Sequence, residues 1–207
     1  MRSFASVLVL ALCLESSAFA QNATAPVPEN QEQLAATVRD TRAAAEQGDA
    51  HAQSKLGEMY DDGRGVPRDG AQAVFWYRKA AEQGLAEAQR HLGTSYGRGF
   101  GVAHDDAQEV FWYRKAAEQG DAVAQSMLAV SYGQGRGVKQ DHAQAVFWYR
   151  KAAEQGDARS QTNLGLMYLA GKGVARDDAQ GFVWLRKAAE QGNALAQEAL
   201  RKFGPAP

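Results

Sequence analysis

The side chains that could bind a metal ion are few and scattered along this chain of 207 residues. Its four histidines are His51, His91, His104 and His142. None belongs to a His-x-x-x-His pair, the spacing that puts two imidazoles on one helix face for zinc. His104 beside Asp105, and His142 beside Asp141, could hold a cation weakly, but helix capping explains these aspartates better. The sequence therefore predicts no metal site and no cofactor.

Motifs for covalent catalysis and for phosphate binding give no stronger signal. The chain has no Ser-x-x-Lys, and neither a nucleophile elbow nor paired carboxylates stand out beyond what a regular repeat explains. The glycine-rich segment 97–101 (GRGFG) is expected to follow a helix rather than a strand, and it lacks the Gly-Lys-Ser/Thr ending of a phosphate loop. We therefore predict that the protein has no catalytic activity of its own.

Positive and negative charges nearly balance, with 23 lysines and arginines against 24 aspartates and glutamates. The formal net charge of -1 gives no general attraction to nucleic acid, so no nucleic-acid partner is predicted. An Arg-Lys pair recurs at 78–79, 114–115, 150–151 and 186–187 and could touch phosphates or lipid. Because a glutamate follows each arginine by four residues, a neutralised, solvated helix face is the better interpretation.

A regular repeat underlies the whole chain. The segment AVFWYRKAAEQG begins at Ala73 and Ala145, and with one change at Glu109; a looser copy begins at Gly181. The glycines that close these copies recur every 36 residues, at Gly84, Gly120, Gly156 and Gly192. A period of this length indicates a stack of similar units rather than one globular core.

Each unit is predicted to form two antiparallel helices, as the first copy illustrates. Asp49 can cap a helix that runs to about Tyr60, and a loop with two glycines and a proline then ends it. Asp69 starts a second helix, with Gln72 three residues later as in a variant capping box. Gly84 supplies a left-handed cap, and the short turn after it forces antiparallel packing. The pattern therefore predicts an all-α solenoid.

The unit resembles the Sel-one-like repeat (SLR) family, relatives of the tetratricopeptide repeat. The resemblance rests on Leu56-Gly57, Gly63-x-Gly65-Val66, Asp69 and the segment 76–84 (WYRKAAEQG), and it recurs through four units. It implies a right-handed α-solenoid (superhelix) at 34–207, with full repeats at 49–84, 85–120, 121–156 and 157–192. Segments 34–48 and 193–207 have atypical sequences and are predicted to cap its ends. The third unit departs once, with Ala129 where the other units have glycine.

One tryptophan recurs in each second helix, and the four are Trp76, Trp112, Trp148 and Trp184. An exposed ladder of aromatic rings could stack sugars or bases. Each ring lies at the same helical phase beside small residues such as Ala80 and Ala81, so we predict that the tryptophans are structural and belong to the core.

The first helices carry most of the variation between units. Positions equivalent to 51, 54, 55, 58 and 62 change freely, and in the third and fourth units several of them are apolar. An apolar centre with an arginine rim is typical of a protein-binding patch, so a binding face is the preferred interpretation and drift of exposed positions the alternative. The predicted partner-binding residues are Arg90, Arg98, Val123, Met127, Val130, Arg159, Asn163 and Leu166.

Residues 1–20 are typical of a secretory signal peptide. Arg2 precedes the apolar run VLVLALCL, which is too short to span a bilayer, and AFA at 18–20 is a small-x-small cleavage signal. Cleavage after Ala20 would remove Cys13, the single cysteine, and would leave an exported protein without an integral membrane segment. An uncleaved anchor is the alternative. Residues 21–33 are polar with two prolines and are predicted to form a flexible linker.

The SLR resemblance implies a function as well as a fold. SLR proteins commonly act as adaptors, and their first helices line the concave side of the solenoid. We therefore predict a secreted or periplasmic scaffold that binds another protein or a peptide segment on its first-helix face. One alternative is a carbohydrate- or cell-wall-binding module. Another is an enzyme like the cysteine-rich SLR branch linked to β-lactam hydrolysis, although that branch carries paired cysteines in its repeats and this chain does not.

Overall fold

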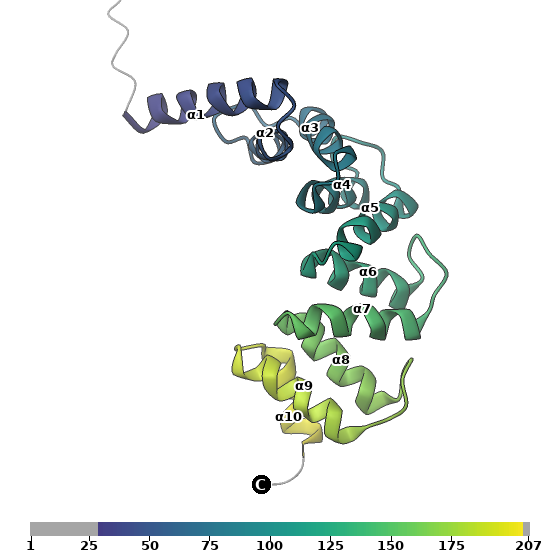
Figure 1. Cartoon of the computed structure of the whole chain (residues 1–207). Helices are drawn as coiled ribbons and strands as arrows, with labels where there is room; N and C mark the ends of the chain where they lie inside the picture. The colour runs from purple at the N-terminus through teal and green to yellow at the C-terminus, as the bar shows by residue number, and fades with distance from the viewer. Residues whose placement is uncertain (1–28, 205–207) are drawn as a thin grey trace, which may run out of the picture.

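The computed structural model describes residues 29–204, which form ten α-helices and no strand. The helices follow one another along a curved arc, with α1 and α10 at its opposite ends (Figure 1). Their bounds are α1 (Glu29–Glu46), α2 (Ala50–Asp62), α3 (Gly70–Glu82), α4 (Ala86–Arg98), α5 (Asp106–Glu118), α6 (Ala122–Gln134), α7 (His142–Glu154), α8 (Ala158–Ala170), α9 (Asp178–Glu190) and α10 (Ala194–Phe203).

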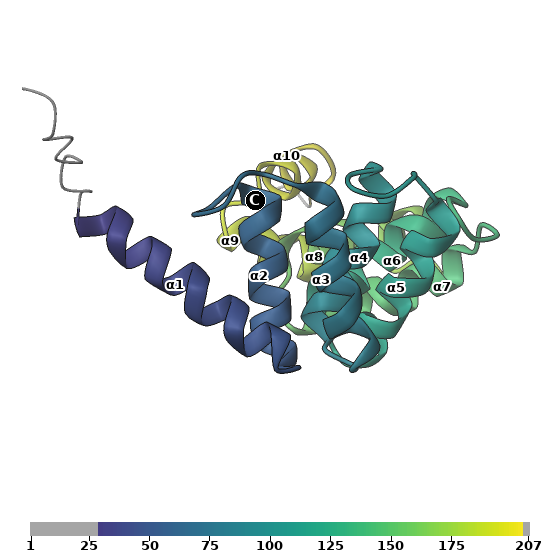
Figure 2. The ribbon, with the colours of Figure 1, turned by 90° about the horizontal axis from the view of Figure 1, so that it is seen from above.

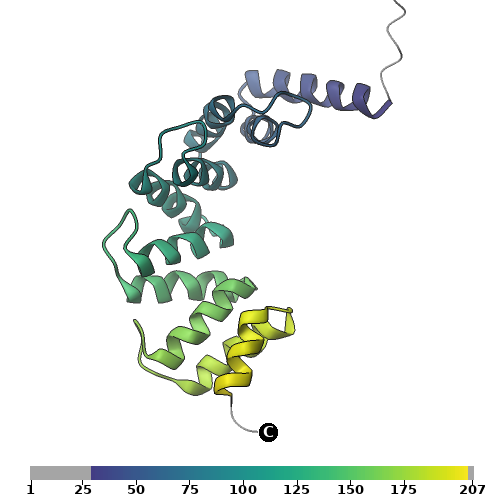
Figure 3. The same ribbon diagram turned by 180° about the vertical axis from the view of Figure 1, so that it is seen from behind.

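The arrangement is the predicted all-α solenoid of antiparallel helix pairs. Each helix packs mainly against the helices that precede and follow it in the sequence. The long loops between α6 and α7 and between α8 and α9 project from the outer edge of the arc (Figures 1 and 3). Seen from above, α1 leans away from α2 (Figure 2). No helix within residues 29–204 combines the length and the apolar character that a bilayer crossing requires.

Seven of the helices from α2 onward begin at an aspartate cap, whereas α4 follows Leu85 without a side-chain cap and α10 is capped by Asn193. Asp49 and Asp69 accept hydrogen bonds from the backbone N–H groups of Ala52 (2.7 Å) and Gln72 (3.1 Å). The second half of the capping box is absent at Asp69, because its own N–H donates to the carbonyl of Tyr60 across the loop (2.9 Å). This bond holds the two ends of the loop 63–69 together, which explains how so long a connection still gives an antiparallel pair.

The amino-terminal cap differs from the prediction. The helix begins at Glu29, so residues 29–33 of the predicted linker are helical, and the cap is not confined to 34–48. The segment ENQEQ has good helix formers and no proline, and its glutamates lie at the end of the helix that favours negative charge. The helix is anchored from Val38 onward, where side chains become buried. The predicted signal peptide and the rest of the linker lie outside the described residues.

The tryptophans occupy the core with unequal burial. Trp76 and Trp112 are each 8% exposed, so both rings lie in the core. Trp148 and Trp184 are half-buried and pack against the hydrophobic cluster around Tyr149 and Leu164. Most hydrophobic clusters of the core contain residues from more than one repeat, as expected for a solenoid in which each unit is stabilised by its neighbours.

Two glycine positions show why this residue recurs. Gly84 has φ +96° with open space around it, so backbone conformation alone requires glycine there. Gly57 is helical, but a Cβ there would lie 2.6 Å from the Tyr77 ring. In the third unit Ala129 takes the equivalent place, and the facing Tyr149 is 8% exposed compared with 1% for Tyr77. The ring that faces Ala129 is therefore slightly more exposed than the ring that faces Gly57.

The basic row has a different function from the predicted one. Arg78, Arg114 and Arg150 each donate to a tyrosine hydroxyl in the first helix of the next repeat, at 2.9, 2.9 and 2.7 Å. No Arg–Glu pair at four-residue spacing is found among the ion pairs of residues 29–204. Since the tyrosine lies within reach and partly buried, the guanidinium gains a charged hydrogen bond there rather than a solvated surface pair. The row therefore joins adjacent repeats.

Candidate functional site

The term first-helix face denotes one side of the first helices of the repeats, α2, α4, α6 and α8. It comprises the side chains at the positions equivalent to 51, 55 and 58. Its two halves differ in chemistry. On α2 and α4 the face carries the charged Lys55, Glu58 and Glu87, together with His91. On α6 it is apolar, with Val123 50% exposed and Met127 and Val130 half-buried. On α8 only Leu166 is apolar, beside the polar Arg159 and Asn163.

The predicted partner-binding residues are not equally available. Val123, Arg98 and Arg159 are exposed. Met127, Val130 and Leu166 instead pack against three different hydrophobic clusters of the core, so that only their edges reach the surface. The apolar surface that these four residues expose is thus smaller than the sequence suggests, and Val123 is its most accessible member.

The other two predicted residues are engaged within the protein. Arg90 pairs through Nε with Oδ2 of Asp121 at 3.0 Å, which ties α4 to the start of α6. Asn163 is half-buried beside Tyr149. Burial raises the pKa of the Tyr149 phenol, and the nearby Arg159 guanidinium and Asn163 side chain oppose this rise.

One variable position proved to be buried. Ser54, Ser126 and Thr162 are 2%, 5% and 1% exposed, although the helix phase of their own units placed them on the variable side. Ser160 on α8 donates to the Ser126 hydroxyl at 2.9 Å, so this position lies where adjacent first helices meet. Packing between repeats cannot be deduced from the phase of a single helix.

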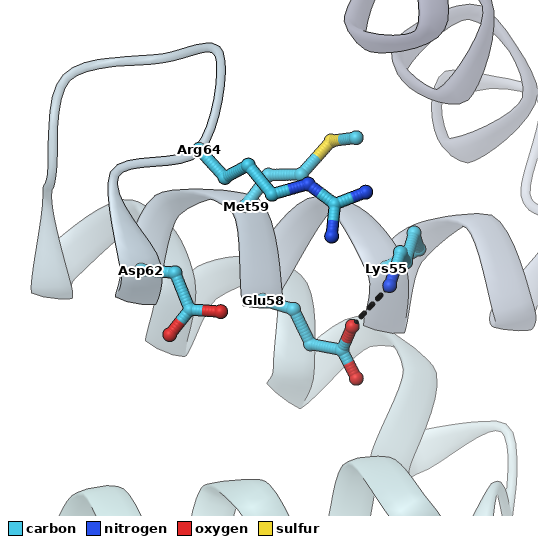
Figure 4. A pocket seen from close by; sticks show the side chains of 5 residues that line it. All are labelled: Lys55, Glu58, Met59, Asp62 and Arg64. Carbon is cyan, nitrogen blue, oxygen red and sulfur yellow. Dashed lines mark hydrogen bonds and ion pairs between the residues drawn. The ribbon is translucent and has the colours of Figure 1, made fainter. Parts of the chain in front are cut away.

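The charged half of the face surrounds a pocket of about 350 Å³, lined by His51, Ser54, Lys55, Glu58 and Glu87. Nζ of Lys55 bonds Oε2 of Glu58 at 2.6 Å. Figure 4 shows this pair at a second pocket, which Met59, Asp62 and Arg64 also line. Burial pushes the pKa of Glu58 upward, but the Lys55 ammonium, Glu87 and His91 together outweigh it. The pKa of Glu58 therefore lies below its ordinary value, and the group is a carboxylate at neutral pH.

His91 lies at the edge of this pocket, on α4. Its ring stacks on Tyr77, with ring centroids 4.9 Å apart and planes 9° apart. Burial, followed by the Arg90 guanidinium, lowers the pKa of His91, although Glu58 acts in the opposite direction. The imidazole is thus neutral at pH 7. No role for His91 follows from local sequence signals, because Glu58 and Tyr77 belong to the preceding repeat, and only the 36-residue period could have revealed these contacts.

The letters Gly93-Thr94-Ser95-Tyr96-Gly97 match the Gly-x-Ser-x-Gly pattern of a nucleophile elbow, but the structure excludes that function. The segment lies inside α4 rather than on a strand-to-helix turn. Ser95 is 3% exposed, and its hydroxyl donates to the carbonyl of His91 at 3.0 Å. A buried hydroxyl bonded to its own helix is not available as a nucleophile.

The second helices also carry a row of exposed phenylalanines, called the outer row below, which the sequence analysis did not predict. Phe75, Phe111 and Phe147 on α3, α5 and α7 are 47%, 44% and 46% exposed. Each packs edge-on against the following tryptophan, as in the pair Phe75–Trp76 (4.9 Å, 81°). A lysine ammonium lies over each phenylalanine ring, at 4.7, 5.0 and 5.8 Å. The outer row is therefore aromatic and basic, and its ring faces are partly covered.

Glu109 on α5 is an unusual buried carboxylate, 4% exposed, where the first and third units have alanine. Its Oε1 accepts from Arg136 at 3.0 Å, but its Oε2 is buried without a partner. Burial raises the pKa of Glu109, and the attraction of Arg136 only partly offsets this effect. The side chain lies over Gly97, where a Cβ would come within 2.5 Å of Oε1.

Comparison with known proteins decides the family. The Sel1 repeat profile matches residues 50–85, 86–121, 122–157 and 158–193. The chain belongs to the Sel1 repeat family. These four matches coincide with the four helix-turn-helix units, each one residue later than the predicted repeat boundaries.

Two solved structures are similar over most of this Sel1 repeat chain. One is a protective antigen present in uropathogenic Escherichia coli strains that displays an SLR fold, with 43% identity over 84% of this chain and 40% of that one, at a TM-score of 0.78. The other is a Sel1 repeat protein from Oxalobacter formigenes, with 38% identity over 82% and 49% of the two chains and a TM-score of 0.77. The chain spans less than half the length of either relative.

The cysteine-rich branch is a more distant relative. Cysteine rich protein B of Helicobacter pylori is 26% identical over 64% of this chain and 96% of that one, with a TM-score of 0.51. The comparison with curated proteins found no match. Sel1 repeat proteins generally mediate protein–protein interactions.

Proposed function

We propose that this chain is an exported adaptor that binds a segment of another protein on its first-helix face, centred on Val123. The observation that carries the proposal is an apolar side chain left 50% exposed on a face that varies between repeats. The second helices, by contrast, repeat almost without change. Membership of the Sel1 repeat family supports an interaction function, and its position on this face is our inference.

The residues around Val123 define the kind of partner. Val123 offers an apolar contact, which the exposed edges of Met127 and Val130 extend. The exposed guanidinium groups of Arg98 and Arg159 carry positive charge on neighbouring repeats. A segment with a leucine- or phenylalanine-like anchor and nearby acidic residues would complement both features.

Capture of the partner from the native compartment tests the proposal with one matched pair of variants. Val123→Asp should lose the partner, because a charge replaces the apolar contact. Val183→Asp is the control, since Val183 is 42% exposed on α9, outside the first-helix face. Both sites are exposed, so both variants should keep the helicity of the wild type. Equal capture by Val123→Asp and wild type would place the contact elsewhere. Met127 and Val130 are unsuitable for this test because both pack against the core.

Export is the second part of the proposal and rests on the sequence of residues 1–20. A signal peptide cleaved after Ala20 would deliver the solenoid to the periplasm or the outside of the cell. Amino-terminal sequencing of the protein recovered from culture fractions should give Gln21 as the first residue. Recovery of a soluble cytoplasmic product that still begins with Met1 would contradict it.

A carbohydrate- or cell-wall-binding function has weaker support. The buried indoles of Trp76 and Trp112 offer no stacking surface, and the exposed rings of the outer row have lysines over their faces. Sugar stacking needs an open ring face, so a peptidoglycan pull-down is expected to leave the protein in the supernatant. A β-lactam hydrolase function has no supporting site within residues 29–204, and a nitrocefin assay is expected to show no turnover.

A further inference from the structure

Three ligand-type atoms from two adjacent repeats converge beside the charged pocket. Glu58 lies on α2, and Glu87 and His91 lie one turn apart on α4. Their ligand atoms are all within 4.8 Å of one another. Nε2 of His91 is 3.6 Å from Oε1 of Glu58 and 3.9 Å from Oε1 of Glu87. Spacing along one helix did not indicate this cluster because its members come from two units.

The contact with Arg90 identifies the acceptor nitrogen of the neutral His91 imidazole. Nη2 of Arg90 lies 3.3 Å from Nε2 of His91. A guanidinium can only donate hydrogen bonds, so Nε2 is the acceptor nitrogen of the ring. The stacked Tyr77 ring fixes the imidazole in this plane. Three acceptors therefore face one another, an arrangement that a cation would stabilise.

A buried polar group in the same pocket gives independent support. Ser54 is 2% exposed and lines the pocket together with Glu58 and Glu87, yet its hydroxyl has no hydrogen-bond partner. The equivalent hydroxyls of Ser126 and Thr162 are both bonded, to Ser160 and to the carbonyl of Ala158. Buried hydroxyls are rarely left unpaired in proteins, so the one at Ser54 points to a ligand in the pocket.

We propose that Glu58, Glu87 and His91 bind a divalent metal ion of the zinc class between the first and second repeats. Zinc accepts imidazole and carboxylate ligands at about 2.0–2.2 Å, which sets neighbouring ligand atoms about 3.3 Å apart in a tetrahedral site. The separations of 3.6 and 3.9 Å need only small side-chain movements to reach that value. A water molecule completes the coordination and bonds the Ser54 hydroxyl.

The neighbouring cations leave the site accessible. Lys55 engages Oε2 of Glu58 and leaves Oε1 for the metal. Arg90 is the competing charge, because Nη2 must leave Nε2 of His91 when the ion binds. The ion pair between Nε of Arg90 and Asp121 would still hold the guanidinium after Nη2 has left His91. Removing Arg90 should therefore strengthen metal binding.

The test uses the tag-free full chain after treatment with a chelator, titrated with Zn²⁺ in a calorimeter. Glu87→Gln is the leading variant, since this side chain is 45% exposed and its loss leaves the fold intact. We expect one ion per chain for the wild type and at least tenfold weaker binding for Glu87→Gln and for His91→Gln. Arg90→Gln should bind more tightly than the wild type.

His104→Gln is the matched control, because His104 also faces a carboxylate, at 3.3 Å from Asp106, but belongs to a loop outside the site. It should bind Zn²⁺ as the wild type does. Co²⁺ substitution adds a second readout, the visible absorption of a tetrahedral site, which Glu87→Gln should lose. Absence of binding by the wild type, or equal binding by the wild type and Glu87→Gln, would overturn the proposal.

Discussion

Glu109→Gln is expected to change the way in which stability depends on pH. Glu109 is buried and its pKa is raised, so the folded protein holds this proton more tightly than the unfolded chain does. Its contribution to stability is therefore fully present below the ordinary glutamate pKa of 4.5 and is lost as pH rises through the folded-state pKa. Glutamine has the same shape and no charge, so the stability of the variant should not fall in this way as the pH rises.

The magnitude follows from the partners of the two carboxylate oxygens. A buried acceptor without a partner, as at Oε2, costs about 1–3 kcal/mol. The bond of Oε1 to Arg136 returns less than about 1 kcal/mol, because the Arg136 side chain is 42% exposed. We therefore expect the unfolding free energy of Glu109→Gln, relative to wild type, to rise by about 1–2 kcal/mol between pH 4.5 and about pH 8.

Urea unfolding followed by circular dichroism at several pH values measures this difference. Taking the variant minus the wild type cancels the titration of the other groups, provided that the m-values agree. Glu118→Gln is the control, since Glu118 is an exposed glutamate of the same helix and should give a flat difference. A flat or falling difference for Glu109→Gln would refute the reasoning, because it would mean that the carboxylate is not held in an unfavourable environment.

Three further predictions concern packing and the contacts between repeats. Trp112→Ala should cost about 3–5 kcal/mol because the ring is 8% exposed, and Trp184→Ala should cost clearly less because that ring is half-buried, as thermal unfolding can compare. Gly57→Ala should lower the stability by about 1–3 kcal/mol because its Cβ would meet the Tyr77 ring at 2.6 Å, and an unchanged melting temperature would show that the ring moves freely. Tyr132→Phe removes the hydroxyl that accepts the inter-repeat arginine at 2.9 Å and should cost about 0.5–1.5 kcal/mol in urea unfolding; no loss would indicate that water replaces the bond.

Most of the fold could be predicted from local sequence signals. Asp49, Asp69 and their equivalents mark the helix starts because a cap acts on its own helix and depends on nothing distant. The burial of Trp76 follows in the same way from the phase of one helix. The exposure of Phe75 could be predicted by the same argument, since Phe75 lies opposite the buried side of α3. The early start of α1 was missed because prolines at its boundary resemble those of a linker.

The candidate site was harder to predict because its contacts join different repeats. Ser54 is buried by a neighbouring first helix, and His91 meets Glu58 only because the units stack. Met127 also packs against a cluster that its repeat shares with the preceding one, which makes it less accessible than its helix phase suggests. None of these relations appears within a single unit. They become predictable only when residues 36 apart are treated as spatial neighbours.

The arginine–tyrosine bonds also determine where the protein gives way under tension. One such bond crosses each of four successive contacts, from α1, α3, α5 and α7 to the helix that follows. The first joins Arg42 to Tyr60, and the last joins Arg150 to Tyr168. The corresponding position after Arg186 is Gly204, so the junction between α9 and α10 has no tyrosine to receive the guanidinium. A chain pulled from both ends should therefore open first at its carboxyl end. Each full repeat that follows would release up to about 120 Å of extended chain.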